Sequence, residues 1–100
     1  MKVLILEALN VREAEIENTL EALQRAVCGY IEALTLVPGK AVMIVNEEGL
    51  LRGMAPNPAA SMIARIKIVG PAIVVGVDGE EFTDLPEDVK QRIHRILTLE

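Results

Sequence analysis

Apolar residues in this chain follow two spacings, and each spacing predicts a different kind of element. Leu20, Leu23 and Val27 recur at intervals of three and four residues, which places them on one face of a helix. Runs of Val and Ile such as residues 73–77 are typical of buried strands. The pattern predicts an α+β fold: a small antiparallel-rich or mixed sheet, a central helix after the first strands and a C-terminal helix.

The central helix has capping residues at both ends. Asn18 is predicted to cap its first turn, with Glu21 bonding back to the Asn18 amide. Gly29 is predicted to take the left-handed conformation that ends a helix, so the helix should stop near Cys28. Because Cys28 is the only cysteine, it has no partner for an internal disulfide, and we interpret it as a small core residue.

A hairpin is predicted to follow the central helix. Residues 30–37 suit a strand, the Pro-Gly pair at residues 38–39 fits a type II turn, and residues 41–45 form an unbroken aliphatic strand. We expect this second strand to be buried on both faces. The Asn-Glu-Glu-Gly turn at residues 46–49 then closes it, with Gly49 supplying a positive φ.

The residues before the central helix allow two interpretations. Residues 3–9 are mostly aliphatic and predict the opening strand. Asn10 and Glu13 would cap a helix that begins at Val11. The alternation of apolar and polar residues over about 13–17 instead favours a short strand. We favour the strand and keep the helix as the alternative interpretation.

The second half of the chain opens with a loop. Two prolines and a glycine interrupt residues 50–58, and Asn57 is suited to cap a short helix over residues 58–64. Residues 66–68 and 73–77 are strand-like on either side of a Gly-Pro turn. We expect the second of these, within AIVVGV, to be a central strand.

A turn and a helix complete the predicted elements. The Asp-Gly pair at residues 78–79 marks a turn, after which residues 80–82 return toward the sheet. Asp84 is expected to cap the last helix, with Glu87 closing the capping box. The apolar stripe of this helix consists of Val89, Ile93, Ile96 and Leu97.

Three segments of the chain carry a resemblance. They are NTLEALQRAVCGYIEA, then VNEEGLLRG with Asn57 just after it, then IVGPAIVVGVDGEEFTDLP. Over about residues 15–90 the chain resembles a family of short domains of unknown function encoded by phages, plasmids and integrative elements of bacteria. That family usually has two glycines before the second strand, and Cys28 stands here in the first of those places. The resemblance implies a fold and a mobile-element context, and no established activity.

Length and composition bound the class of protein. A chain of 100 residues is expected to form a single domain, residues 1–100, around one core. Hydrophobic residues make up 51% of it, a high share for so short a chain, so we expect a second copy to cover part of that surface in a homodimer. Because no apolar run is long enough to cross a membrane, we expect a cytoplasmic protein without a membrane partner.

Charge and aromatic content argue against binding of extended nucleic acid. The formal net charge of −5 repels phosphate backbones. Tyr30 and Phe82 are the only aromatic residues that could stack on bases. A small phosphorylated ligand remains compatible with both observations.

Residue types that carry chemistry are sparse. The chain has no GxxxxGK, HExxH or GxSxG motif. Ser61 lies on an alanine-rich helical stretch, His94 has no second histidine to join it, and the acidic pairs at residues 47–48 and 80–81 are more typical of solvated turns than of a metal site. We therefore predict that the protein is not an enzyme and has no catalytic residue, metal or cofactor.

One polar constellation remains. Asn46, Glu47, Arg52 and Asn57 lie in two consecutive loops and are predicted to converge at one end of the sheet as a ligand-binding site. Asparagine amides can recognise a base or sugar edge, and Arg52 can bind phosphate bidentately. In the alternative interpretation both asparagines satisfy turn backbones, and Arg52 pairs with Glu48 in solvent.

These observations lead to two hypotheses for function. The first is a small non-enzymatic binding protein that sequesters a nucleotide-like signal and so counters host defence. The alternative is an interaction module that binds a host protein by an edge strand or a helix face, without a small ligand. A deep polar pocket would favour the first hypothesis, and a flat apolar edge would favour the second.

Overall fold

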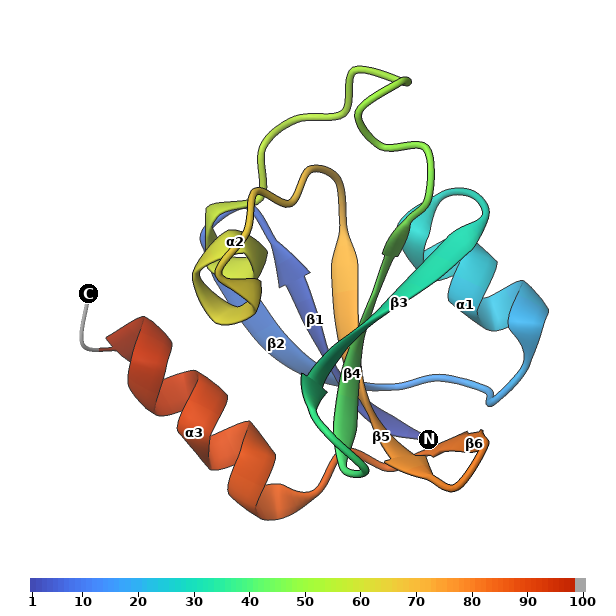
Figure 1. Ribbon diagram of the computed structural model, residues 1–100, viewed down its shortest axis with the longest axis vertical. Coiled ribbons are helices and arrows are strands. Elements are labelled where there is room, and N and C mark those ends of the chain that lie inside the picture. Colours follow the sequence, from blue (N-terminus) through green and yellow to red (C-terminus); the bar gives the residue numbers. More distant parts are fainter. Residues whose placement is uncertain (99–100) are drawn as a thin grey trace.

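The computed structural model describes residues 1–98, with six strands and three helices (Figure 1). In chain order these are β1 (Lys2–Glu7), β2 (Asn10–Glu15), α1 (Leu20–Val27), β3 (Ile31–Val37), β4 (Ala41–Asn46), α2 (Pro58–Ala64), β5 (Ala72–Asp78), β6 (Glu81–Thr83) and α3 (Glu87–Thr98). The predicted α+β fold is confirmed, because every strand pairing is antiparallel and α1 follows the first two strands.

Strand β5 lies at the centre of the sheet. The order across the sheet is β2-β1-β5-β4-β3, and the short β6 pairs with β5 outside that path. Ile73 of β5 is opposite Ile5 of β1 on one side and Ile44 of β4 on the other. The central position predicted for AIVVGV is therefore confirmed. Its unbroken apolar run is explained by helices on both faces of the sheet.

Helices cover both faces of the sheet, with α1 on one side and α2 and α3 on the other (Figure 1). Because successive strand residues point to opposite faces, the same strands supply two cores. The core under α1 contains Val3, Leu23, Val27, Ile44, Ile73 and Val75. The core under α2 and α3 includes Leu4, Leu6, Met43, Val45, Ala60, Val74, Val89 and Ile93. The sheet is thus the middle of three layers.

Helix α1 is capped by a different residue from the one predicted. Thr19 is the N-cap, and its hydroxyl oxygen accepts a hydrogen bond from the Ala22 amide at 3.1 Å. Asn18 instead donates its side-chain amide to the Phe82 carbonyl at 2.8 Å, which ties the start of α1 to β6. The prediction that Asn18 caps the helix is wrong, because the Thr19 hydroxyl accepts the first-turn amide and Asn18 bonds to β6 instead.

Helix α1 ends at a left-handed residue, but that residue is Cys28 and not Gly29. Cys28 has a φ of 66° and a ψ of 35°, and the Gly29 amide donates to the Gln24 carbonyl at 3.0 Å. The Cys28 side chain is exposed, so the prediction of a small core residue is wrong. A left-handed residue turns the chain sharply out of the helix, and here that turn carries its side chain away from both cores.

Strand β2 settles the ambiguous segment before α1. It pairs with β1 with Val3 opposite Ala14, so the strand interpretation is confirmed and the helix beginning at Val11 is wrong. The strand begins at Asn10, earlier than the predicted residue 13, because the turn at residues 8–9 is only two residues long and pairing starts directly after it.

The β3–β4 hairpin is confirmed, and Gly39 in its turn has a φ of 73°. The positive φ predicted for Gly49 is wrong. Gly49 is needed for a different reason, since a Cβ there would lie 2.9 Å from the Val69 Cγ2 and 3.2 Å from the Val69 carbonyl oxygen. In the loop that follows, the glycine with a positive φ is Gly53, at 65°.

The segment after α2 stays irregular. Residues 66–68 do not form the predicted strand, and the pairing nearest to them is a single bridge between Pro56 and Val69. Arg65 takes a left-handed φ of 62° to end α2, and Gly70 has a φ of 79° before β5 begins. The Ile68 amide donates to the Ser61 hydroxyl and the Ile68 carbonyl accepts from the Asn57 amide, so this segment bonds to the start of α2 and not to a neighbouring strand.

Helix α3 begins at Glu87, and Asp84 does not cap it. The Asp84 carboxylate instead accepts a hydrogen bond from the Lys2 backbone amide at 2.7 Å, at the start of β1. The predicted cap is wrong because β1 offers this amide directly beside the chain that enters α3. Val89 and Ile93 of the predicted stripe are buried, as expected.

Candidate functional site

Asn46 ends β4 and is almost fully buried, with 5% of its surface exposed. Its Nδ2 donates to the Val27 carbonyl at 2.9 Å, and its Oδ1 accepts from the Glu48 amide at 2.7 Å. Glu47, the next residue, is exposed. The Asn46 side chain therefore joins the last turn of α1 to the turn after β4.

Arg52 lies beside Asn46 and binds the same helix end. Its Nη1 donates to the Cys28 carbonyl at 2.6 Å, so the two side chains together cap two consecutive carbonyl groups at the end of α1, those of Val27 and Cys28. The space between them is tight, since a Cβ on Gly29 would lie 2.8 Å from both Arg52 Nη1 and Asn46 Nδ2. Within residues 1–98, no ion pair joins Arg52 to Glu48.

Asn57 caps α2 and is buried, with 1% of its surface exposed. Its Oδ1 accepts from the Ala60 amide at 3.1 Å. Its Nδ2 donates to the carbonyls of Leu6 and Gly70, both at 2.8 Å. One asparagine therefore joins the start of α2, the end of β1 and the segment that enters β5.

The structure brings together only part of the predicted constellation. Asn46 and Glu47 line one shallow groove, whereas Asn57 lines a separate hollow with Met54 and Gly70. The amides of both asparagines already bond to the backbone, as the alternative interpretation expected. The described part of the chain contains no buried side-chain nitrogen or oxygen without a hydrogen-bond partner. Ligand binding by these residues stays a prediction.

The groove beside Asn46 is mainly apolar and has a volume of about 360 Å³. Its lining includes Leu34 of β3, Val45 of β4, Leu50, Leu51, Ile66, Ile68 and Val69. Glu32, Glu47 and Lys67 add charge around it. The loop after β4, which carries one wall of the groove, extends beyond the rest of the molecule (Figure 1).

That loop, residues 47–53, is held by its own backbone and is called the leucine loop below. The Arg52 amide donates to the Glu48 carbonyl at 2.9 Å, and the Gly53 amide donates to the Leu50 carbonyl at 3.1 Å. Even so, Leu50 is 72% exposed and Leu51 is 88% exposed. The loop is thus an ordered segment that presents two leucines to solvent.

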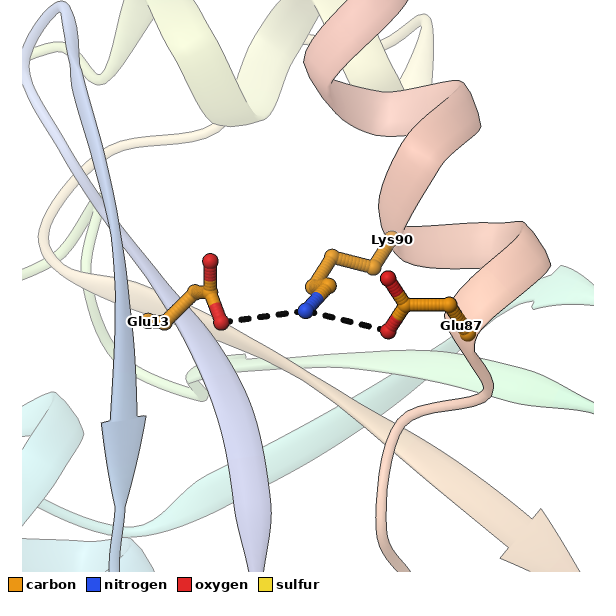
Figure 2. Close-up of polar contacts among 3 residues, drawn as sticks. All are labelled: Glu13, Glu87 and Lys90. Atoms are coloured by element: carbon orange, nitrogen blue, oxygen red, sulfur yellow. Dashed lines mark hydrogen bonds and ion pairs between the residues drawn. The ribbon is translucent and has the colours of Figure 1, made fainter.

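A second cleft, of about 370 Å³, lies between β2 and the start of α3. Figure 2 shows Lys90 of α3 between two carboxylates, with its Nζ 3.0 Å from Glu13 Oε1 and 3.0 Å from Glu87 Oε2. The hydrogen bond and charge of Lys90 lower the pKa of Glu13, and both carboxylates raise the pKa of Lys90. A lysine held in its charged form in this way is a poor base or nucleophile, so the cluster is suited to joining β2 to α3.

Sequence reasoning did not find the Glu13–Lys90 pair, because 77 residues separate its members. It also left the role of Ser61 unassigned. The Ser61 hydroxyl donates to the Asn57 carbonyl at 2.8 Å and accepts from the Ile68 amide at 2.8 Å, which is a structural use. Among residues 1–98, no group of three or more His, Cys, Asp or Glu side chains is placed to hold a metal ion.

The fold and these sites define a small three-layer α+β domain with an antiparallel sheet and ordered polar caps at its helix ends. The chain belongs to the family described as Domain of unknown function (DUF3846), whose model matches residues 1–98. This agrees with the resemblance to short uncharacterised domains and extends it over nearly the whole chain. Neither a curated protein nor a solved structure matches the chain.

The described helices were also compared with the length and hydropathy that a membrane span requires. None of the helices within residues 1–98 is both long enough and apolar enough to cross a bilayer.

Proposed function

We propose that this protein is a non-enzymatic interaction module that binds another protein through the leucine loop and the apolar groove beside it. The observation that carries the proposal is the pair Leu50 and Leu51, exposed at 72% and 88% on a loop with ordered backbone hydrogen bonds. Exposed apolar residues gathered beside an apolar groove are typical of a surface that a partner covers.

The order of the loop adds to this argument. Asn46 and Arg52 fix the two ends of the leucine loop to the last turn of α1. Binding through such a loop costs little conformational entropy, since the backbone does not have to be ordered by the partner.

The groove indicates the chemistry of the partner. Its floor is aliphatic, so an apolar side chain of the partner would bury surface there at about 25 cal/mol per Å². Glu32, Glu47 and Lys67 at its sides supply both signs of charge, which favours a polar rim around an apolar anchor. The mobile-element context that the resemblance implies makes a host protein the proposed partner.

Nucleotide sequestration is the second candidate, and Arg52 is the residue that favours it. Arg52 is exposed and uses Nη1 for the Cys28 carbonyl, so its other donors can still meet a phosphate. The buried amides of Asn46 and Asn57 argue the other way, because a ligand would have to break bonds that hold the fold. We therefore place protein binding first.

The main experiment compares Leu51→Asp with Leu9→Asp. Leu9 is 77% exposed in the turn between β1 and β2, so both variants place a carboxylate on an exposed leucine, one inside the proposed surface and one outside it. Tagged wild type and variants are used for quantitative affinity enrichment from host cells. Each protein that Leu51→Asp loses is then purified and titrated by calorimetry.

The expected result is a partner that binds wild type and Leu9→Asp alike and binds Leu51→Asp at least tenfold more weakly. If Leu51→Asp enriches the same host proteins as wild type, that result would contradict the proposed binding surface. In a parallel assay, the protein is incubated with cyclic and linear nucleotides, filtered and denatured. Depletion and intact recovery of a nucleotide, reduced in Arg52→Ala, would instead support sequestration.

A further inference from the structure

The two strands that end the β2-β1-β5-β4-β3 path of the sheet are protected very differently. Strands β2 and β3 each pair on one side only, with β1 and β4 respectively. β2 carries three charged residues among six, namely Arg12, Glu13 and Glu15, whereas Glu32 is the single charged residue among the seven of β3. Charges on an edge strand prevent pairing with other chains, so β3 is the edge that is open to pairing.

The free backbone groups of β3 follow from its pairing with β4. The Glu47 amide donates to the Tyr30 carbonyl at 2.9 Å, which marks residue 30 as bonded toward β4. Hydrogen-bonded and non-bonded positions alternate along an antiparallel ladder. Ile31, Ala33 and Thr35 therefore direct their amide and carbonyl groups away from β4, toward the open edge.

We propose that two copies of the chain pair through β3, antiparallel and about a two-fold axis at Ala33, to form one continuous sheet. In this register Ala33 faces its own copy, and Ile31 faces Thr35 of the partner. All three outward residues then exchange both of their backbone hydrogen bonds. The register uses only residues 31–35, and so avoids the irregularity that β3 shows between Thr35 and Val37.

Side chains and charge favour a second copy in this position. Ala33 is small and exposed, so it places no bulk at the axis. Glu32 faces Leu34 of the partner, so the two Glu32 residues are not directly opposite and meet only diagonally, at the longer spacing of about 7–8 Å. An otherwise uncharged strand is a place where chains with a net charge of −5 can approach each other.

This inference goes beyond the proposed function and does not depend on it. Its test is the mass of the protein in solution for Ala33→Pro and, as a matched control, Glu15→Pro. The Ala33 amide is not bonded to β4, so proline at this position removes no hydrogen bond within a single chain. It does remove the two backbone hydrogen bonds that Ala33 would exchange with its own copy at the axis. The Glu15 amide points outward from β2 in the same way, because Met1 and Ile16 form the adjacent bonded pair.

The expected result in sedimentation equilibrium at micromolar concentration is a dimer for wild type and for Glu15→Pro, and a twofold lower mass for Ala33→Pro. Far-UV circular dichroism and thermal unfolding check that each variant is folded. A monomeric wild type would overturn the proposal. So would an Ala33→Pro variant that is folded and still dimeric.

A second variant keeps the proposal testable if proline prevents folding. Ala33→Cys in a Cys28→Ser background places two thiols at the axis, where the Cα atoms of a hydrogen-bonded pair lie about 5.5 Å apart, a separation that suits a disulfide. Mild oxidation should link most of this variant into covalent dimers. Absence of the link under oxidation would overturn the register.

Discussion

The side-chain amide of Asn57 donates to the Leu6 carbonyl at 2.8 Å, across 51 residues of sequence. The same nitrogen donates to the Gly70 carbonyl, while its oxygen caps α2. Leu6 lies in β1 and forms its last pair with β5, and Gly70 lies two residues before β5 begins. Asn57 is predicted from the sequence to cap a seven-residue helix. In the structure it also joins that helix, α2, to the neighbouring strands β1 and β5.

Asn57→Ala should destabilise the protein by about 2–4 kcal/mol, because it removes a helix cap and leaves one buried and one partly buried carbonyl without their donor. Urea unfolding followed by circular dichroism measures this. Asn18→Ala is the matched control, since it removes one exposed hydrogen bond to Phe82 and should cost less than about 1 kcal/mol. Equal losses in the two variants would show that the Asn57 bonds do not hold the fold.

Leu23→Ala should cost about 2–5 kcal/mol by opening a cavity under α1. Leu23 is 3% exposed, and it packs in the core with Val3 and Ile73. Leu20→Ala in the same helix is the control, because Leu20 is 54% exposed and its truncation opens no cavity. An unchanged urea midpoint for Leu23→Ala would contradict its place in the core.

Gly76→Ala should destabilise the protein by about 3 kcal/mol or more, through a clash and not through backbone conformation. A Cβ at Gly76 would lie 2.1 Å from the Asp84 carbonyl oxygen, where the chain crosses toward α3. Gly53→Ala is the comparison, since Gly53 has a φ of 65° with open space around it and should cost only about 1 kcal/mol. Thermal unfolding of both variants separates the two effects.

Lys90→Met should raise the pKa of Glu13 back toward its ordinary value of 4.5, because Lys90 lowers that pKa. A lowered carboxylate pKa contributes stability that is present above the unfolded value and is lost as the pH falls through the folded value. Lys90 has a raised pKa, so its contribution to folding stability is lost only as the pH rises through its folded-state pKa, above 10.5. Wild type should therefore lose stability on acidification below about pH 4.5 more steeply than Lys90→Met.

The measurement for this prediction is a carbon NMR titration of the Glu13 carboxyl in both proteins. Lys40→Met is the control, because Lys40 pairs with Asp88 and lowers the pKa of that carboxyl instead. Lys40→Met should leave the Glu13 titration unchanged. A Glu13 pKa that stays the same in Lys90→Met would show that the bridge in Figure 2 is not formed in solution.

The candidate site illustrates what local patterns can and cannot reveal. Asn46 stands out in the sequence because it ends an apolar run, and Asn57 because it precedes the proline that opens a predicted helix. Both are buried polar residues of the structure. Their partners Val27 and Leu6 are 19 and 51 residues away, and those partners are backbone carbonyls that no side-chain pattern marks. Sequence reasoning could thus find the residues, while their hydrogen bonds needed the assembled fold.

The predictions of turns and helix caps divide in the same way, into those that depend on neighbouring residues and those that depend on distant ones. Gly39 and Asp-Gly at residues 78–79 follow rules that concern a few neighbouring residues, as does the cap at Asn57. The predictions for Gly39 and Asn57 are confirmed, and the predicted Asp-Gly turn lies one residue later, at residues 79–80, because Asp78 still pairs with Glu81. Asn18 and Asp84 obey the same local rules, but distant partners at Phe82 and Lys2 take their side chains. A local cap contributes about 1 kcal/mol, so a tertiary hydrogen bond of similar strength can replace it.

Hydrophobic periodicity in the sequence predicted the class of fold and most of its elements, but wrongly predicted a strand at residues 66–68, because periodicity reports which faces are buried and not what they are buried against. The order β2-β1-β5-β4-β3, the bridge from Glu13 to Lys90 and the helix cap made by Asn46 and Arg52 were decided only by the tertiary structure. Each of these joins residues that are far apart in the chain. Their contact energies exist only once the sheet has assembled, and periodicity within one element carries no information about them.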